Sequence, residues 1–326
     1  MEKLVELTGS RLVCPFNKNN SGMSFSLVDY RNNFFTSNNR KKIIEFYNSF
    51  ENRNQLIQWM RDRPRGNCAI REIEGDNDII LVIPTIDSEG EFARNCSQNI
   101  FKGLHIIFVE SYYNNFYFNY AHNCNVGIRK AMEYNPKWII VSNDDMDKVD
   151  NVEILKEALN SLDNSYYDVV FPSSSDYHTI PFYISKKRIT YQIYKLITEK
   201  QTKIFYDKFD VNFFNSRFTL KSKFIFKKVK GTDFINITAF SILSSNYIKT
   251  LGDHIFDETY INEREDVDLS YRFVLTDARF AFISYSIKAL RGSTLGNNFS
   301  RGLRSVAGRI YFNFKYERLF IKMLQR

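Results

Sequence analysis

The chain has 326 residues, which is long enough for one large domain or two ordinary domains with a substantial core. Apolar residues make up 44% of it and aromatic residues 16%, and this composition argues against an intrinsically disordered protein. The four cysteines and four histidines are scattered without a Cys-x-x-Cys pair, so the sequence indicates neither a disulfide framework nor a zinc site. The first residues lack the pattern of a secretory signal, and no apolar run approaches the ~20 residues that span a bilayer, so we expect a cytoplasmic protein.

The formal net charge of +8 is spread unevenly along the chain. Residues 183–230 contain thirteen Lys and Arg against three acids, residues 291–326 contain eight against one, and the rest of the chain is net −9. This asymmetry predicts that the two basic segments face an anionic partner or surface, which includes a peripheral contact with an anionic membrane. Aromatic side chains alternate with the cations in the first segment, so base stacking on nucleic acid and plain helix packing with snorkelling lysines are open alternatives.

Residues 1–75 are polar and rich in asparagine. Ile43, Tyr47 and Phe50 recur at helical spacing, which predicts one helix over residues 41–60. A run with proline and glycine follows and ends this helix. No catalytic pattern stands out here, and we interpret the segment as an accessory N-terminal extension.

From residue 76 onward, short apolar runs alternate with helical patterns. Strands are expected at 79–85, at 104–110, from Trp138 and at 168–172, with helical segments at 89–102 and around 124–132. This alternation predicts an α/β fold with a mostly parallel, Rossmann-like central sheet, flanked by helices and joined by right-handed crossovers. No Gly-x-Gly-x-x-Gly and no Gly-Lys-Ser/Thr loop follows these strands, which argues against a dinucleotide-binding domain and a P-loop enzyme.

An acidic cluster follows the strand that begins at Trp138. Asp144, Asp145 and Asp147 come directly after a run of β-branched and apolar residues. Open α/β sheets bind ligands at the carboxyl ends of their strands, and carboxylates at this spacing suit a divalent cation that holds a diphosphate. A solvated acidic turn is the alternative.

A second acidic cluster lies near the end of the chain. Because Val267 and Val274 share a helical face, Glu265, Asp266 and Asp268 fall in the first turn of an expected helix. Capping and the helix dipole alone account for acids at this position, and Asp268 has the spacing to pair with Arg272 four residues on.

Five short motifs occur in order between residues 78 and 275. They are Ile83-Pro-Thr85, Val109-Glu-Ser111, Asn125-Val-Gly-Ile128 with Ala131, Ser142-Asn-Asp-Asp145, and Phe256-Asp-Glu-Thr-Tyr260 followed by Glu265-Asp266-Val-Asp268-Leu269 and Arg272. Their order and spacing resemble those of the family 2 glycosyltransferases of the GT-A fold. In that comparison the fourth motif stands where the family has its metal-binding Asp-x-Asp, and the fifth resembles its acceptor-side Glu-Asp motif.

The resemblance implies an inverting glycosyltransferase that uses a nucleotide-sugar donor, a UDP- or GDP-sugar, and a glycan, lipid-linked or protein acceptor. It implies Mn²⁺ or Mg²⁺ at Asp145, assisted by Asp144 or Asp147, and Asp266 as the catalytic base with Glu265 in reserve. The residues that it places at the donor are Pro84, Thr85, Glu110, Asn125, Gly127, Asn143, Asp144 and Arg291. Residues 76–290 would form the GT-A domain, with a nucleotide-sugar half over 76–180 and an acceptor half over 181–290, and residues 291–326 a basic amphipathic tail.

The sequence also departs from the family pattern. Asn143 replaces the first acid of Asp-x-Asp, Glu110 replaces the usual aspartate, and Arg291 falls where a histidine is common. Two other functions compete with a glycosyltransferase. A nucleotidyltransferase would need a glycine- and arginine-rich loop after the first strand, where the chain is acidic, and a nucleic-acid-binding protein would have a recognisable module, which we do not find.

Overall fold

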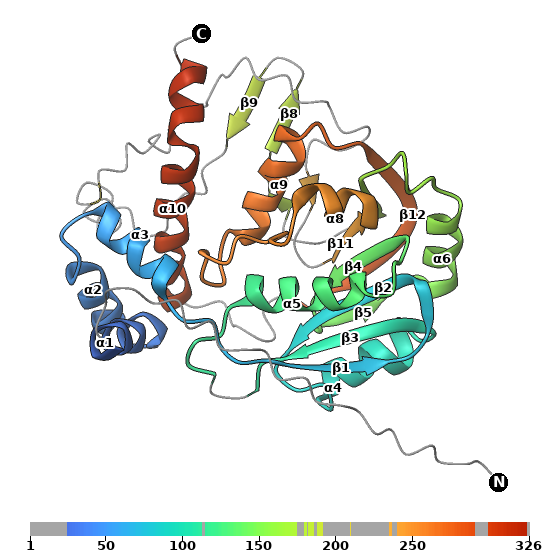
Figure 1. Ribbon diagram of the computed structural model, residues 1–326, viewed down its shortest axis with the longest axis horizontal. Coiled ribbons are helices and arrows are strands. Elements are labelled where there is room, and N and C mark those ends of the chain that lie inside the picture. The colour runs from blue at the N-terminus through green and yellow to red at the C-terminus, as the bar shows by residue number, and fades with distance from the viewer. Residues whose placement is uncertain are drawn as a thin grey trace.

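The structure is a computed structural model, drawn as a ribbon in Figure 1. It describes residues 25–112, 115–174, 179–180, 182–185, 188–191, 209, 235–236, 240–290 and 299–324. Most of the basic segment 183–230, as well as Arg291, therefore lies outside the described residues. Of the helices that the structure describes, none combines the length and the apolar character needed to cross a membrane.

A central sheet organises the described part of the chain. Its eight strands lie in the order β1-β3-β2-β4-β11-β6-β12-β5. Their bounds are Ala69–Ile73 for β1, Asp76–Thr85 for β2, Leu104–Glu110 for β3, Trp138–Ser142 for β4, Met146–Lys148 for β5, Val169–Ser174 for β6, Phe240–Ser244 for β11 and Phe280–Ala289 for β12. Two short ribbons stand apart from it and pair β7 (Thr179–Ile180) with β10 (Ile235–Asn236) and β8 (Phe182–Ser185) with β9 (Arg188–Tyr191). The four strands expected from the sequence are confirmed as β2, β3, β4 and β6.

The sheet is mixed, so the expectation of a mostly parallel sheet is not confirmed. β2 pairs in parallel with β3 and β4, and β6 pairs in parallel with β12. Antiparallel pairing joins β1 to β3, β11 to both β4 and β6, and β5 to β12. The difference arises because β11 enters the sheet between β4 and β6 in the opposite direction. The α/β class itself is confirmed.

Helices cover both faces of the sheet, which follows from the strand pattern. Alternate residues of a strand point to opposite faces, and β2 places Ile80 and Val82 in one core and Ile79 and Leu81 in the other. The first core is shared with α5 (Tyr120–Met132), α8 (Ser245–Leu251) and α9 (Glu265–Leu275). The second is shared with α4 (Glu91–Asn95), the π-helical turn at Cys96–Ile100 and α6 (Val152–Asn160). Hydrophobic burial on both faces stabilises the three layers.

The N-terminal helices pack against the long C-terminal helix (Figure 1). Their bounds are Phe25–Thr36 for α1, Arg40–Asn48 for α2, Arg53–Asp62 for α3 and Phe299–Leu324 for α10. The single helix expected over 41–60 is wrong, because the side chain of Asn52 caps a new helix by accepting a hydrogen bond from the Gln55 N–H. The buried Tyr47 hydroxyl donates to the Leu303 carbonyl over 2.7 Å and accepts from the Ala307 N–H over 3.0 Å, which ties α2 to α10.

Candidate active site

Three parallel strands deliver polar residues to one edge of the sheet. Thr85 at the end of β2 lies opposite Glu110 at the end of β3. The register of β2 on β4 pairs Val82 with Val141, so the residues that follow β4 lie beside the end of β2. Such carboxyl ends of parallel strands are where open α/β sheets bind ligands.

The turn after β4 holds the first acidic cluster. The Thr85 hydroxyl donates to Oδ2 of Asp144 over 2.7 Å. Burial raises the pKa of Asp144, and the neighbouring charge of Asp145 raises it further, against the opposing hydrogen bond from Thr85. The Leu290 N–H donates to the Asp145 carbonyl over 2.8 Å, which holds this turn against the end of β12. Asp147 is exposed in β5, where it lies opposite Lys288 of β12.

The acids after β4 are the residues that could hold a metal ion at this edge of the sheet. Within the described residues, no group of three or more His, Cys, Asp and Glu side chains is arranged to hold a metal ion. Mg²⁺ beside a nucleotide is usually bound by one or two carboxylates together with phosphate oxygens and water, and Asp144 and Asp145 fit that partial set. Their mutual repulsion, which contributes to the raised pKa of Asp144, would be relieved by a cation.

Glu110 is buried at the end of β3. It is 5% exposed, and its Oε1 accepts hydrogen bonds from the Ser88 N–H over 2.9 Å and from the Ser88 hydroxyl over 2.6 Å. The same carboxylate therefore orders the turn that follows β2. Ser88 was not singled out from the sequence, although its spacing of three residues from Thr85 is a usable signal.

Three of the expected donor residues are buried and packed by the protein itself. Pro84 lies inside β2, opposite Val109. Asn125 of α5 donates from Nδ2 to the Phe256 carbonyl over 2.8 Å and accepts from the Phe256 N–H over 2.9 Å. Gly127 lies where a Cβ would come within 2.3 Å of a Val82 methyl group, so its small size permits α5 to approach the sheet. These contacts explain the presence of Pro84, Asn125 and Gly127 by packing and hydrogen bonding within the protein.

Glu265 and Asp266 begin α9 and have different surroundings. Glu265 is 8% exposed, and its Oε2 is buried without a hydrogen-bond partner among the described residues. Burial and the charge of Asp266 raise the pKa of Glu265 well above its usual value. Asp266 is partly exposed, its Oδ1 accepts from the Val267 N–H over 2.6 Å, and burial raises its pKa to about 6. A pair of this kind can exchange a proton near neutral pH.

Tyr120, the first residue of α5, lies between the two acidic clusters. Its hydroxyl donates to Oδ1 of Asn143 over 3.0 Å. Its pKa is raised well above normal by burial, by a neighbouring cysteine, and then by the charges of Glu265 and Asp266, which places these carboxylates near it. Its backbone N–H donates to Oδ1 of Asn262 over 2.7 Å, in the loop before α9. Tyr120 therefore connects Asn143 after β4 with the loop that leads into α9, and no sequence motif had pointed to Tyr120.

Asp268, two residues beyond Asp266, is held in the protein interior by its own hydrogen bonds and an ion pair. It is fully buried, and it accepts hydrogen bonds from the Tyr260 hydroxyl over 3.1 Å and the Tyr316 hydroxyl over 2.9 Å. Lys315 of α10 approaches it within 2.8 Å. The pair of Asp268 with Arg272 that their spacing permits is not formed, because the guanidinium of Arg272 donates to the carbonyls of residues 254 and 255, near the beginning of the loop between α8 and α9.

Arg291 lies outside the described residues, so its expected place at the donor stays a prediction. The chain matches no model of a known protein family, and no curated protein matches it.

Proposed function

We propose that the protein transfers a sugar from a nucleotide-sugar donor to an acceptor hydroxyl with inversion at the anomeric carbon. The observation that carries this proposal is Tyr120, which contacts Asn143 after β4 and lies near Glu265 and Asp266 at the start of α9. A transferase that inverts needs an acidic site for the leaving diphosphate and a separate base for the incoming hydroxyl. Tyr120 connects the turn after β4 with the loop that leads into α9, and this connection supports a site of that kind.

The edge formed by β2, β3 and β4 would hold the donor. Thr85, Glu110 and Asn143 lie there with Asp144 and Asp145, whereas Asp147 is exposed beside Lys288. Asp144 and Asp145 would hold Mn²⁺ or Mg²⁺, which when bound supplies Lewis-acid stabilisation of the departing diphosphate. The electrostatic coupling between these two acids supports Asp144 rather than Asp147 as the second ligand.

Asp266 would take the proton from the acceptor hydroxyl. A sugar hydroxyl is a poor nucleophile near neutral pH, and a positioned base typically contributes ~10² to 10⁴ in rate. The pKa of Asp266, about 6, suits this task because the group is mainly ionised at neutral pH and still accepts a proton. Burial and the charge of Asp266 raise the pKa of Glu265 well above its usual value, which favours its neutral form and limits the charge repulsion between the two acids.

One feature counts against a nucleotidyltransferase. Such an enzyme binds a triphosphate with backbone N–H groups after its first strand, but the N–H of Ser88 in this turn donates to Glu110. A nucleic-acid-binding protein would depend on the basic segment 183–230, most of which lies outside the described residues, so the structure does not test that alternative. We retain the glycosyltransferase as the proposal on the geometry given above.

Calorimetry with UDP and GDP, with and without Mn²⁺, tests the donor site. We expect one nucleoside diphosphate to bind more tightly when Mn²⁺ is present, and the variant Asp145→Ala to lose this metal-dependent gain. Asp163→Ala is the matched control, because Asp163 is an exposed acid in the turn after α6. If neither nucleotide binds under any condition, or if Asp145→Ala binds as the wild type does, the proposed site is wrong.

A further inference from the structure

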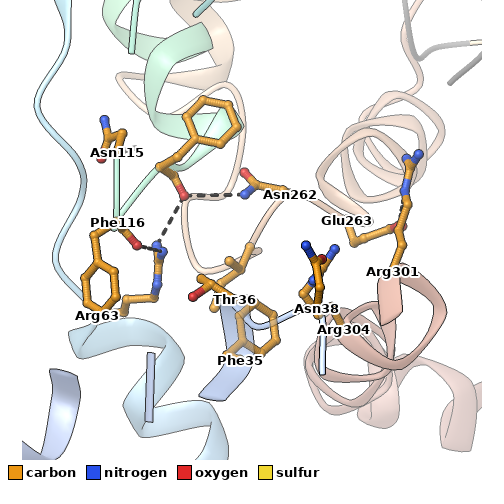
Figure 2. Close-up of a pocket in the computed structure, with 12 residues that line it drawn as sticks. Phe35, Thr36, Asn38, Arg63, Asn115, Phe116, Asn262, Glu263, Arg301 and Arg304 are labelled. Carbon is orange, nitrogen blue, oxygen red and sulfur yellow. Dashed lines mark hydrogen bonds and ion pairs between the residues drawn. The ribbon is translucent and has the colours of Figure 1, made fainter. Parts of the chain in front are cut away.

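A cavity lined by both charged and apolar side chains lies beside the loop that leads into α9 (Figure 2). Its volume is about 210 Å³, and its walls come from the ends of α1 and α3, the 115–118 loop, the 261–263 loop and the first turns of α10. Figure 2 shows Arg63 on one side of it and Arg301, Arg304 and Glu263 on the other, with Phe35 and Thr36 between them. It is separate from the edge of β2, β3 and β4 where the donor is proposed to bind.

The charge of this cavity is unbalanced. Among its described lining residues, three arginines stand against one glutamate, which leaves an excess of two positive charges. Glu263 pairs with Arg301, with 3.2 Å between Nε and Oε1. Within the described chain no carboxylate forms an ion pair with Arg63 or Arg304. An anion is the ligand that this arrangement favours.

Arg63 is a buried cation, with only 2% of its surface exposed. Its guanidinium donates to Oδ1 of Asn32 and to the carbonyls of Phe116, Tyr117 and Phe118. These are four bonds among described residues, and a guanidinium has five N–H donors. Burial, followed by repulsion from Arg65, lowers its pKa, although arginine stays charged in proteins. A nearby anion would offset the cost of burying this charge.

Arg301 and Arg304 lie in the first two turns of α10, which begins at Phe299. The helix dipole makes this end of a helix unfavourable for cations. Burial lowers the pKa of Arg304 and the charge of Arg301 lowers it further, so the two arginines repel each other. Among the described residues, the guanidinium of Arg304 donates one hydrogen bond, from Nη1 to the Ser37 carbonyl over 3.1 Å, and its other N–H groups are directed to no described acceptor.

We propose that this cavity binds a phosphate group carried by the acceptor substrate. Arginine presents donors in a planar fork that matches the oxygens of a phosphate. A volume of about 210 Å³ is below the ~300 Å³ at which pockets for whole small ligands begin, so it suits the phosphate end of a larger molecule.

The position of the cavity makes the acceptor the source of the phosphate. Asn262 lines the cavity, and its Oδ1 accepts a hydrogen bond from the backbone N–H of Tyr120. Glu263, which also lines the cavity, precedes the proposed base Asp266 by three residues. This assignment to the acceptor rests on the function proposed above. The binding of a phosphate in the cavity does not depend on that function.

The first test is calorimetry of the full chain with inorganic phosphate, without nucleotide or metal. We expect Arg304→Gln to lower the affinity at least about tenfold, because a hydrogen bond to a charged group is lost, and Arg304→Lys to retain part of it. Arg94→Gln, at an exposed position on α4, makes the same charge change and should bind as the wild type. Thermal melts confirm that each variant is folded. Absence of phosphate binding in the wild type, or equal binding by Arg304→Gln, overturns the proposed cavity.

The second test separates the acceptor from the donor. Release of nucleoside diphosphate from the sugar donor is measured with matched alcohols that do or do not carry a phosphate monoester. We expect the phosphorylated member to have the lower KM and Arg304→Gln to remove that advantage, with donor affinity unchanged. Equal KM values for both members overturn the assignment to the acceptor. A chain that binds phosphate through Arg304 but binds no nucleotide would instead contradict only the proposed function.

Discussion

At the scale of single residues, the environment decides which acid of α9 can act as a base. Asp266 and Asp268 are two residues apart, but Asp268 is fully buried between two tyrosines and Lys315, whereas Asp266 is partly exposed. Lys315 also pairs with Asp257 over 2.7 Å, so this lysine neutralises two carboxylates in a structural network. Asp266 has no such cation among its hydrogen-bonded partners in the described residues. Burial raises the pKa of both carboxyl groups, but only Asp266 remains partly exposed and accessible to a substrate.

The variant Asp266→Asn should lose at least about a hundredfold in kcat and bind the donor normally, because a neutral amide cannot accept the proton. In the wild type, kcat should rise with pH through about 6 as Asp266 ionises. Asparagine caps a helix about as well as aspartate, so a mere capping role predicts less than ~1 kcal/mol of lost stability and normal turnover. Asp277→Asn, exposed after α9, is the control. Near-normal turnover of Asp266→Asn would exclude this residue as the base.

At the scale of elements, a close approach of α10 positions the loop that carries Glu263. A Cβ at Gly308 would come within 2.7 Å of the Glu263 carbonyl oxygen, and the side chain of Arg264 lies just beyond. Gly302 lies on the same helix with no such neighbour within 4 Å. Glycine weakens a helix interior, so its presence at Gly308 is explained by this contact. The packing of α10 and the geometry at the start of α9 are therefore linked.

Gly308→Ala and Gly302→Ala should change stability in opposite directions. An alanine at Gly302 removes backbone freedom from the unfolded chain and should stabilise by ~0.5–1 kcal/mol. At Gly308 the new methyl group meets a backbone oxygen, and overpacking of this kind costs ~1–3 kcal/mol. Urea unfolding of both variants measures the difference. Equal stabilisation by the two alanines would show that α10 does not contact this loop.

At the scale of the whole molecule, two partly buried acids, Glu258 and Asp266, give opposite dependences of stability on pH. Burial opposes the ionisation of Glu258, but hydrogen bonds from His122 and Asn125 and the charge of Arg65 outweigh it and lower its pKa to about 2. A lowered pKa contributes stability above the usual value of 4.5, and this is lost as pH falls toward 2. The raised pKa of Asp266 contributes stability below its usual value of 3.8, and this is lost as pH rises through about 6.

These two groups together predict a maximum in the free energy of unfolding between about pH 4 and pH 5. Glu258→Gln should reduce the loss on the acid side, and Asp266→Asn should reduce the loss between pH 4 and pH 7. Urea titrations at a series of pH values measure both effects. A wild-type stability that increases steadily from pH 5 to pH 7, with the same slope in Asp266→Asn, would contradict the raised pKa of Asp266.

The sequence by itself determined the local helices and strands and the acidic residues that follow β4 and begin α9. The strands β2, β3, β4 and β6, the helix α5 and the acidic first turn of α9 all follow from apolar periodicity and capping, which depend on neighbours a few residues apart. The break between α2 and α3 was missed, although the cap that causes it, Asn52, is also local.

Only the tertiary structure decided how these elements meet. It inserted β11 between β4 and β6, and it brought Tyr120 to Asn143 and toward Asp266. It also buried Asn125 and Gly127 against their own protein and assembled Arg63 and Arg304 in one cavity from opposite ends of the chain. The physical reason is that these contacts join residues far apart in sequence, and packing free energy summed over the whole core, rather than any local pattern, selects them.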